Sequence, residues 1–472
     1  MGFIQGEGRE QIIMFPESLD EYVTADNPVR FIDVFVEQLN LEELGFKRTE
    51  PEIEGRPAFN PKDLLRLFIY GYLNRICSSR KLERETRRNI EVMWLIGKLS
   101  PGFRTISDFR KENVGAMKNV FRQFTELCRR AGLYGAETVA IDGSKFKAVN
   151  SREKNYNEKK LKRLIEVTDE RIDEYLKRIE EADEEETDDI LRPTAEELKG
   201  KIEELKKRKE DLGKIQRKLE ESGETQLSMT DSEARLMKSR QGTQVCYNAQ
   251  IAVDSKHKLI AAIDVSNDLN DQRQLSNMST EAKQTLGVEK LEVITDRGYY
   301  NNEEVKKCEE AGITVYMDKP KAARRNGKYT RDEFIYKADK DVYICPAGEE
   351  LTYLTTEKYR GLKHYTTNKC VSCEVKKECT DSREGRTIKR LLNEDWLERM
   401  VKRARDNPQK MKQRKELAEH PFGTIKRNMN QGAFLMKGLD KVKGEFSLTA
   451  LAYNMKRAIK VAGVDTLIQA MT

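Results

Sequence analysis

The sequence predicts an α/β protein in which a mixed sheet follows a helical amino-terminal domain. Three observations support this fold class. Apolar residues recur at helical spacing up to about residue 133, five short runs rich in Val, Ile and Tyr follow between residues 138 and 319, and helical segments separate the later runs. A chain of 472 residues exceeds what one compact core usually covers, so we expect several structural units.

Residues 1–133 are expected to form the helical domain. Apolar residues of NPVRFIDVFVEQLNLEELGF recur close to helical spacing, and Pro61 opens a longer amphipathic run that continues to about residue 89. Arginines accumulate on these segments, so the domain could bind a DNA backbone or mediate dimerisation. Helix propensity alone would place the same arginines on any solvated surface.

The mixed sheet is expected from residues 134–151 and 226–320. Its first strand is TVAID, a hairpin follows across the turn DSKH, and the last two strands are LEVITD and ITVYMDK. Helical segments precede and follow LEVITD. The order strand, antiparallel hairpin, helix, strand, helix, strand is that of a ribonuclease-H-like sheet, and several other α/β arrangements share it.

A charged insertion, residues 152–225, interrupts the sheet after its first strand. Apolar residues recur at heptad-like spacing in both halves of the insertion, and more than half of its residues are charged. Pro193 ends the first half, and Thr194 with Glu197 forms a capping-box pattern that starts the second. We expect an antiparallel helical hairpin that projects from the sheet as a spacer, a dimer contact or a DNA arm.

Two aspartates follow core strands in similar local sequences, AIDGSKFKA and ITDRGYY. In the expected topology Asp142 ends the central first strand and Asp296 ends the strand beside it. Two carboxylates at that spacing repel each other unless cations lie between them, and hard oxygen ligands suit Mg²⁺ or Mn²⁺. A pair of such ions can activate a water or a 3′-hydroxyl and stabilise the leaving oxygen of a phosphodiester.

A third acid is expected on a later helix, within RKELAEHPFGTIKRNMN. Glu419 precedes Lys426 by two helical turns, so both side chains lie on nearly the same face. The carboxylate could then hold metal while the ammonium steadies a phosphate. Glu416, one turn earlier, is a competitor, and Pro421 should kink the helix beside the site.

These residues resemble a known family. AIDGSKFKA, ITDRGYY and EHPFGTIKR are similar to the three acidic motifs of the DDE transposases of bacterial insertion sequences, in the group with a helical amino-terminal domain before a ribonuclease-H-like catalytic domain. The resemblance extends to GRPAFNPKDLLRLFIYGYLNRICSSRKLE and RTISDFRKEN, so it covers nearly the whole chain. It implies residues 393–472 as the carboxy-terminal helical part of the catalytic core.

The resemblance implies a function for individual residues. Asp142, Asp296 and Glu419 would be the triad that binds two Mg²⁺ or Mn²⁺ ions, and Lys426 would contact terminal DNA. Related transposases place Tyr and Arg seven and four positions before the glutamate, where this chain has Lys412 and Lys415. The further basic residues that we expect on DNA are Lys145, Arg235, Lys238, Arg297, Arg414, Lys415 and Arg427, with Arg240 and Lys147 beside them.

Cysteines cluster in the segment 321–392, which we expect to be a small β-rich insertion. Cys345, Cys370, Cys373 and Cys379 include a C-x2-C pair and two further thiols, a plausible tetrahedral zinc site. Reduced, metal-free cysteines are the alternative. The other four of the eight cysteines sit in apolar or helical contexts typical of a core.

Charge and hydropathy narrow the protein class. The net charge of +6 is modest, but residues 398–427 carry a basic surplus on a globular part, which suits a polyanion. No apolar run is long enough to cross a membrane and no secretory signal opens the chain, so we expect a cytoplasmic, nucleoid-associated protein without a membrane partner.

The sequence therefore favours a transposase that binds terminal inverted repeats, cleaves at 3′ ends and transfers strands to target DNA. Its partners would be double-stranded DNA and a second copy of the chain, because two ends are processed together. One alternative is a catalytically inactive or domesticated DNA-binding protein. Another is a ribonuclease-H-like nuclease or resolvase.

Overall fold

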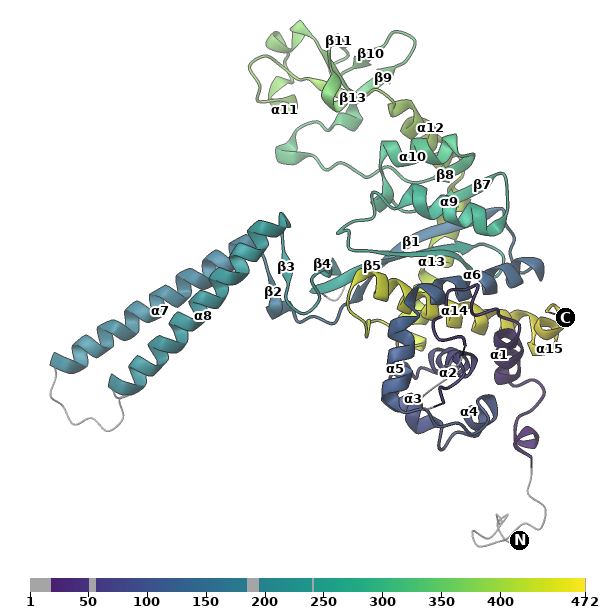
Figure 1. Ribbon diagram of the computed structural model, residues 1–472. Helices are drawn as coiled ribbons and strands as arrows, with labels where there is room; N and C mark the ends of the chain where they lie inside the picture. Colours follow the sequence, from purple (N-terminus) through teal and green to yellow (C-terminus); the bar gives the residue numbers. More distant parts are fainter. Residues whose placement is uncertain (1–17, 51–56, 185–194, 240–241, 472) are drawn as a thin grey trace, which may run out of the picture.

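The computed structural model describes residues 18–50, 57–184, 195–239 and 242–471. It has a central mixed sheet with helices on its faces, a helical arm, and a small antiparallel sheet at the opposite end of the body from the amino-terminal helices (Figure 1). The structure is thus mixed α/β with a helical amino-terminal region, as the sequence predicts. Among the described residues, no helix combines the length and apolar character that crossing a bilayer requires.

The central sheet has six strands in the order β4-β5-β1-β7-β8, and β6 pairs with β5 beyond this path. Strands β1 and β7 run parallel, as do β7 and β8, whereas β5 is antiparallel to β1, β4 and β6. The strands are β1 (Thr138–Lys147), β4 (Arg235–Ser239), β5 (Gly242–Asp254), β6 (Ile260–Ser266), β7 (Leu291–Ile294) and β8 (Ile313–Tyr316). Each of the five expected runs therefore contributes a strand.

The first strand is longer than the sequence predicts. It was expected to end at Asp142, but β1 continues to Lys147 because β5 pairs with it as far as Lys147 and Cys246. Asp142 therefore lies in the middle of β1, opposite Ile251 of β5. Asp296 does follow the end of β7, as expected.

Six helices precede the sheet: α1 (Pro28–Glu37), α2 (Pro61–Leu73), α3 (Ser79–Glu85), α4 (Ile90–Leu95), α5 (Phe103–Glu112) and α6 (Val114–Arg130). Asn27 and Asn60 cap α1 and α2, and each cap precedes a proline at the first helical position, where a missing N–H costs nothing. The expected single run from Pro61 is interrupted between α2 and α3, where Arg75 has a φ of 66°.

The carboxy-terminal helices connect the amino-terminal helices to the sheet. They are α12 (Glu394–Asp406), α13 (Pro408–Gly423), α14 (Leu439–Ala462) and α15 (Val464–Gln469). Helix α14 packs against α6, α2 and β6, so one hydrophobic core runs from Val29 of α1 through the sheet to Leu467 of α15. Two further helices, α9 (Leu275–Leu286) and α10 (Asn302–Glu310), complete the layer between α6 and α12.

The arm is a pair of long helices, α7 (Glu158–Glu184) and α8 (Ala195–Ser222), that pack against each other and extend away from the body (Figure 1). Strands β2 (Asn155–Tyr156) and β3 (Leu227–Ser228) pair at its base, where Asn155 donates to Ser228 Oγ at 2.9 Å. Leu161, Leu212 and Leu219 are buried between the helices. The expected break at Pro193 and the cap at Thr194 lie outside the described residues.

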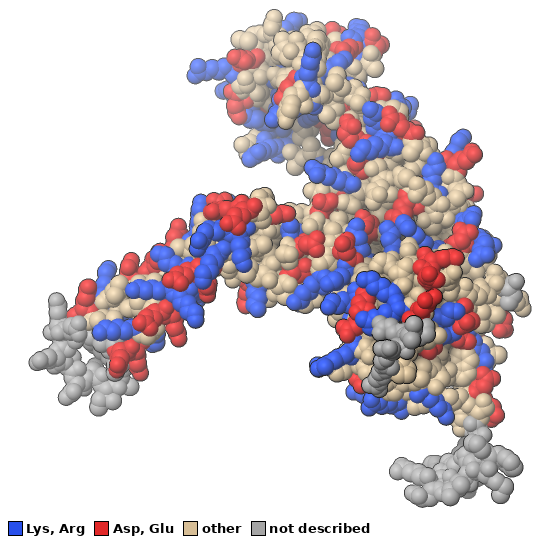
Figure 2. All heavy atoms as spheres, in the orientation of Figure 1, with Lys and Arg blue, Asp and Glu red and all other residues tan. Residues whose placement is uncertain are grey.

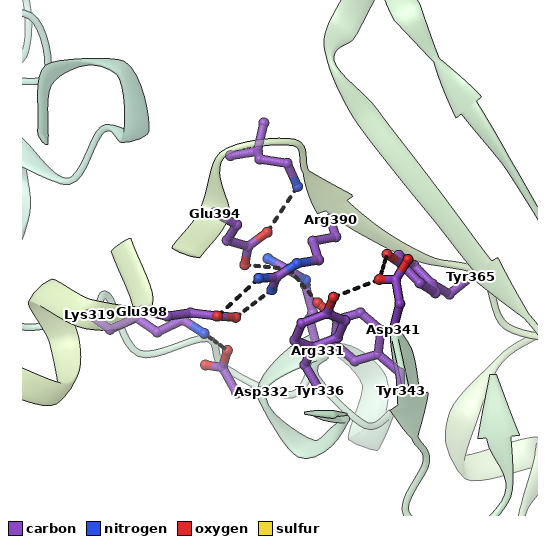
Figure 3. A network of polar contacts seen from close by, with 11 residues as sticks. Lys319, Arg331, Asp332, Tyr336, Asp341, Tyr343, Tyr365, Arg390, Glu394 and Glu398 are labelled. Atoms are coloured by element: carbon purple, nitrogen blue, oxygen red, sulfur yellow. Dashed lines mark hydrogen bonds and ion pairs between the residues drawn. The ribbon is translucent and has the colours of Figure 1, made fainter. Parts of the chain in front are cut away.

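The small sheet is antiparallel, in the order β13-β12-β11-β10-β9. Its strands are β9 (Ile335–Lys337), β10 (Val342–Ile344), β11 (Glu350–Glu357), β12 (Leu362–Thr366) and β13 (Ile388–Leu391), and the short helix α11 (Lys376–Cys379) lies between β12 and β13. Ion pairs join the sheet to α12: Arg331 pairs with Glu394, and Arg390 pairs with Glu398 (Figure 3). The small sheet and α12 are thus held together by charge-assisted contacts.

Candidate active site

The acid pair predicted from the sequence meets at the centre of the main sheet. Strands β1 and β7 are parallel neighbours, with Ala140 of β1 in register with Ile294 of β7. Asp142 follows two positions later on β1, and Asp296 follows two positions later after β7. Asp296 Oδ1 accepts a hydrogen bond from the Gly298 N–H at 2.7 Å, which caps the short turn of residues 297–299.

The environment of Asp142 favours its neutral form. Burial and the nearby Asp296 carboxylate raise the pKa of Asp142 from 3.8 to about 7, while the Arg414 guanidinium and the Gly143 N–H oppose the rise. Two carboxyl groups that share a site cannot both ionise cheaply. A strongly perturbed carboxyl with a named charge partner is typical of a functional site.

Helix α13 supplies the positive charge of this site. Its Leu417 and Ala418 pack on Ala140 of β1, which places Arg414, one turn earlier, near the acid pair. Arg414 was expected on DNA, one position away from the arginine of related transposases. In the structure its charge acts on the Asp142 carboxyl.

Asp271 also belongs to this site. It does not cap the following helix, because α9 begins after Gln274 without a side-chain cap. Asp271 Oδ1 instead accepts hydrogen bonds from Asn248 Nδ2 at 2.6 Å and Gln250 Nε2 at 2.7 Å, and it pairs with Lys145 at 3.5 Å. Two inward-facing amides at alternate positions of a core strand were the signal that could have indicated this contact.

Glycine at position 143 is required by the approach of Asp271. A Cβ atom on Gly143 would lie 2.4 Å from Gln250 Nε2 and 2.6 Å from Asp271 Oδ1, closer than any real contact. The buried Tyr299 hydroxyl donates to Gln250 Oε1, and burial together with the charges of Asp271, Asp142 and Asp296 raises the pKa of Tyr299. A hydrogen-bonded chain therefore runs from Tyr299 through Gln250 to Asp271.

Glu419, the expected third acid, lies on α13. It follows Ala418, which contacts β1, and one residue of α-helix turns the side chain by about 100° away from that contact. Glu419 is exposed, and so is its competitor Glu416. Within the described part of the chain, no three His, Cys, Asp or Glu side chains are grouped to hold a metal ion.

The acid pair nevertheless has the donor chemistry of a cation site. Asp142 and Asp296 offer hard carboxylate oxygens, and a divalent cation would offset the burial and the Asp296 charge that raise the pKa of Asp142. The pair fits such an ion as a two-carboxylate site.

The basic residues expected on DNA fall into two groups. Four of them interact with groups of the protein itself. Lys426 donates to Ser144 Oγ at 2.7 Å and to the Lys145 carbonyl at 2.6 Å. Lys145 pairs with Asp271, the Arg414 charge acts on the Asp142 carboxyl, and the buried Arg235 pairs with Glu224 at 3.0 Å. The exposed ones are Lys238, Arg297, Lys415 and Arg427. Arg240 lies outside the described residues.

The surface shows no large region of a single sign on its visible face. Lys and Arg side chains are interspersed with Asp and Glu over the body, the arm and the small sheet (Figure 2).

Two family models match the chain. A model described as a transposase domain (DUF772) matches residues 17–112, and a model described as a transposase DDE domain matches residues 344–459. The second match contains Arg414, Glu419 and Lys426, whereas Asp142 and Asp296 lie before it. No curated protein and no solved structure matches the chain. The two family matches, one over the amino-terminal helices and one that includes α13, support a DDE transposase of the insertion-sequence type.

Proposed function

We propose that this transposase binds the terminal inverted repeats of its element, cleaves at their 3′ ends and joins those ends to target DNA, with Asp142, Asp296 and Glu419 as its catalytic acids. The observation that carries the proposal is the acid pair on neighbouring parallel strands, in which Asp296 and burial raise the pKa of Asp142 to about 7. The strand order β6-β5-β1-β7-β8 agrees with a ribonuclease-H-like sheet, which supports the same reading.

Divalent cations at the acid pair would activate the attacking hydroxyl and stabilise the leaving oxygen of the phosphodiester. Asp142 and Asp296 would hold them, and Asp142 must release its proton to do so. Arg414 lowers the pKa of Asp142 and so favours the ionised form that binding requires. Lys426 holds β1 at Ser144 and Lys145, directly after the acid.

Glu419 would complete the site from its exposed side. Ala418 packs on β1 and Glu419 is exposed, so its carboxylate would reach the acid pair from the solvent side, where substrate DNA would also approach. A π-helical turn, Thr424–Asn428, follows α13, and such turns are frequent at functional sites. Pro421 lies inside α13, and because proline has no N–H, it removes one backbone hydrogen bond of the helix just after Glu419.

DNA would be positioned by the exposed cations around the site. Arg297 directly follows Asp296, and Lys415 and Arg427 flank Glu419 on the carboxy-terminal helices. Lys238 lies on β4, at the edge of the sheet next to the base of the arm. Binding through such phosphate contacts should weaken steeply with salt, and processing of two ends together implies at least a dimer.

Strand-transfer assays test the catalytic assignment. The substrate is a labelled duplex that carries the inverted repeats flanking the gene, incubated with target DNA and Mg²⁺. Asp142→Asn, Asp296→Asn and Glu419→Gln should each abolish cleavage and joining while end binding survives. Glu416→Gln, one turn earlier on the same helix, is the matched control and should stay active.

Other outcomes distinguish the alternatives. Binding without cleavage by the unsubstituted chain would indicate a DNA-binding protein, and cleavage without joining would indicate a nuclease or resolvase. Loss of activity in Glu416→Gln together with an active Glu419→Gln variant would move the third acid to Glu416.

A further inference from the structure

The small sheet has too little hydrophobic core to be stable on that core alone. Its buried cluster is separate from the main core and consists of Phe334, Tyr343, Leu351, Tyr365 and Ile388. Units of this size usually need a disulfide, a metal ion or another covalent or coordinate link. All eight cysteines of the chain are free thiols, so no disulfide supplies it.

Four of those thiols surround one small cavity in this unit. Cys345 follows β10, Cys370 and Cys373 lie in the segment after β12, and Cys379 ends α11, yet all four line a cavity of about 20 Å³. The other lining groups include Phe334, Leu351 and Val375, so the cavity has an apolar wall. The volume suits a single ion rather than a small-molecule ligand.

Four thiols around one cavity provide the set of ligands that a tetrahedral Zn²⁺ ion prefers. Sulfur ligands of this kind bind Zn²⁺ as thiolates, and the ion itself offsets the repulsion among them.

The backbone around the thiols is arranged for close approach to sulfur. The Glu349 N–H donates to Cys345 Sγ at 3.4 Å, a contact that stabilises a thiolate. Gly385 has a φ of 102°, and a Cβ atom there would lie 2.5 Å from Cys370 Cβ and 3.1 Å from its sulfur. Only glycine lets residue 385 pass over Cys370.

We propose that Cys345, Cys370, Cys373 and Cys379 bind one structural Zn²⁺ ion that holds the small sheet together. Within the described residues no three ligand-type side chains are grouped to hold a metal ion, so the thiols would have to move closer together when the ion binds. Each bound thiol releases its proton to solvent, and no oxidant or reductant is needed.

The ion would also act on the catalytic helices at a distance. The small sheet is joined to α12 through Arg331 with Glu394 and through Arg390 with Glu398 (Figure 3). Helix α12 leads directly into α13, which carries Arg414 and Glu419. Loss of zinc should therefore loosen the helix on which the third acid is carried.

Metal analysis of the full-length chain tests the proposal. Protein produced in zinc-supplemented medium should hold close to one zinc ion per chain after gel filtration. Cys370→Ser and Cys379→Ser should remove that zinc. The matched control is Cys77→Ser, because Cys77 is a partly buried thiol of the amino-terminal helices, far from the small sheet in sequence, and its loss should leave zinc unchanged.

A second measurement covers variants that fail to fold. In the unsubstituted chain, a strong chelator should increase alkylation of the four thiols and hydrogen exchange of residues 335–391, and should leave Cys77 unaffected. Zinc-free protein whose four thiols react at the same rate with and without added Zn²⁺ would overturn the proposal. So would zinc that persists in both Cys370→Ser and Cys379→Ser.

Discussion

Replacing Asp142 by asparagine should make the metal-free protein more stable, increasingly so as pH rises. Burial and Asp296 raise the pKa of Asp142 from 3.8 to about 7 in the folded state. The folded carboxyl therefore holds its proton more tightly than the unfolded one, and stability falls as pH rises through this window and stays lower above it. Asparagine has nearly the shape of aspartate, but it has no carboxyl proton to release.

The magnitude follows from the size of the pKa shift. Between pH 5 and pH 8.5, ionisation of the folded carboxyl should cost the unsubstituted protein about 2 to 3 kcal/mol that the variant does not lose. With an unfolding entropy of about 2 cal/mol/K per residue over 472 residues, each kcal/mol corresponds to about 1 °C in Tm. The difference in Tm between the two proteins should thus grow by about 2 to 3 °C.

Differential scanning fluorimetry in EDTA at pH 5 and pH 8.5 measures this change directly. Asp395→Asn is the control, because Asp395 is an exposed residue of α12 whose ion pair with Arg399 should contribute little. Addition of Mg²⁺ at pH 8.5 should stabilise the unsubstituted protein and narrow the gap. A gap that stays constant between the two pH values would refute the argument from burial and charge repulsion.

Two further predictions concern the neighbours of the acid pair. Arg414→Gln removes a positive charge and should raise the pKa of Asp142, whereas Asp271→Asn removes a negative charge and should lower it. The acidic limbs of the pH profiles of DNA cleavage by the two variants should therefore move in opposite directions. Gly143→Ala should destabilise the fold by about 1 to 3 kcal/mol, because the side-chain ends of Gln250 and Asp271 must shift, whereas Gly200→Ala, in open space on α8, should stabilise it by up to about 1 kcal/mol. Thermal denaturation separates these cases, and a neutral Gly143→Ala variant would contradict the close approach.

Local sequence patterns predicted which helices and strands form, but they did not predict where every one of them ends. Runs of β-branched residues predicted the five core strands, and the parallel pairing of β1 with β7 placed Asp142 and Asp296 together. The extension of β1 to Lys147 depends on pairing with β5, more than ninety residues later, so the expected end of the strand at Asp142 was wrong. Partners that are distant in sequence decided this boundary.

The basic residues show the same limit. Nothing in the sequence around Arg235 indicates that Glu224 pairs with it, and nothing around Lys426 indicates that Ser144 accepts a hydrogen bond from it. Charge counts identify the basic residues, but they do not show which of them pair with other groups of the protein. The contact of Asp271 with Asn248 and Gln250 likewise depends on how β5 and the loop after β6 meet in space.

The position of α14 makes the order of synthesis matter to this protein. The first six helices leave the ribosome early, but the surfaces of α2 and α6 that α14 covers stay open until residues 439–462 have emerged. A nascent or prematurely terminated chain would expose the apolar faces of α2 and α6 for most of its translation. Chaperones and proteases would bind such exposed faces. Burial of these faces is thereby tied to the synthesis of residues 439–462.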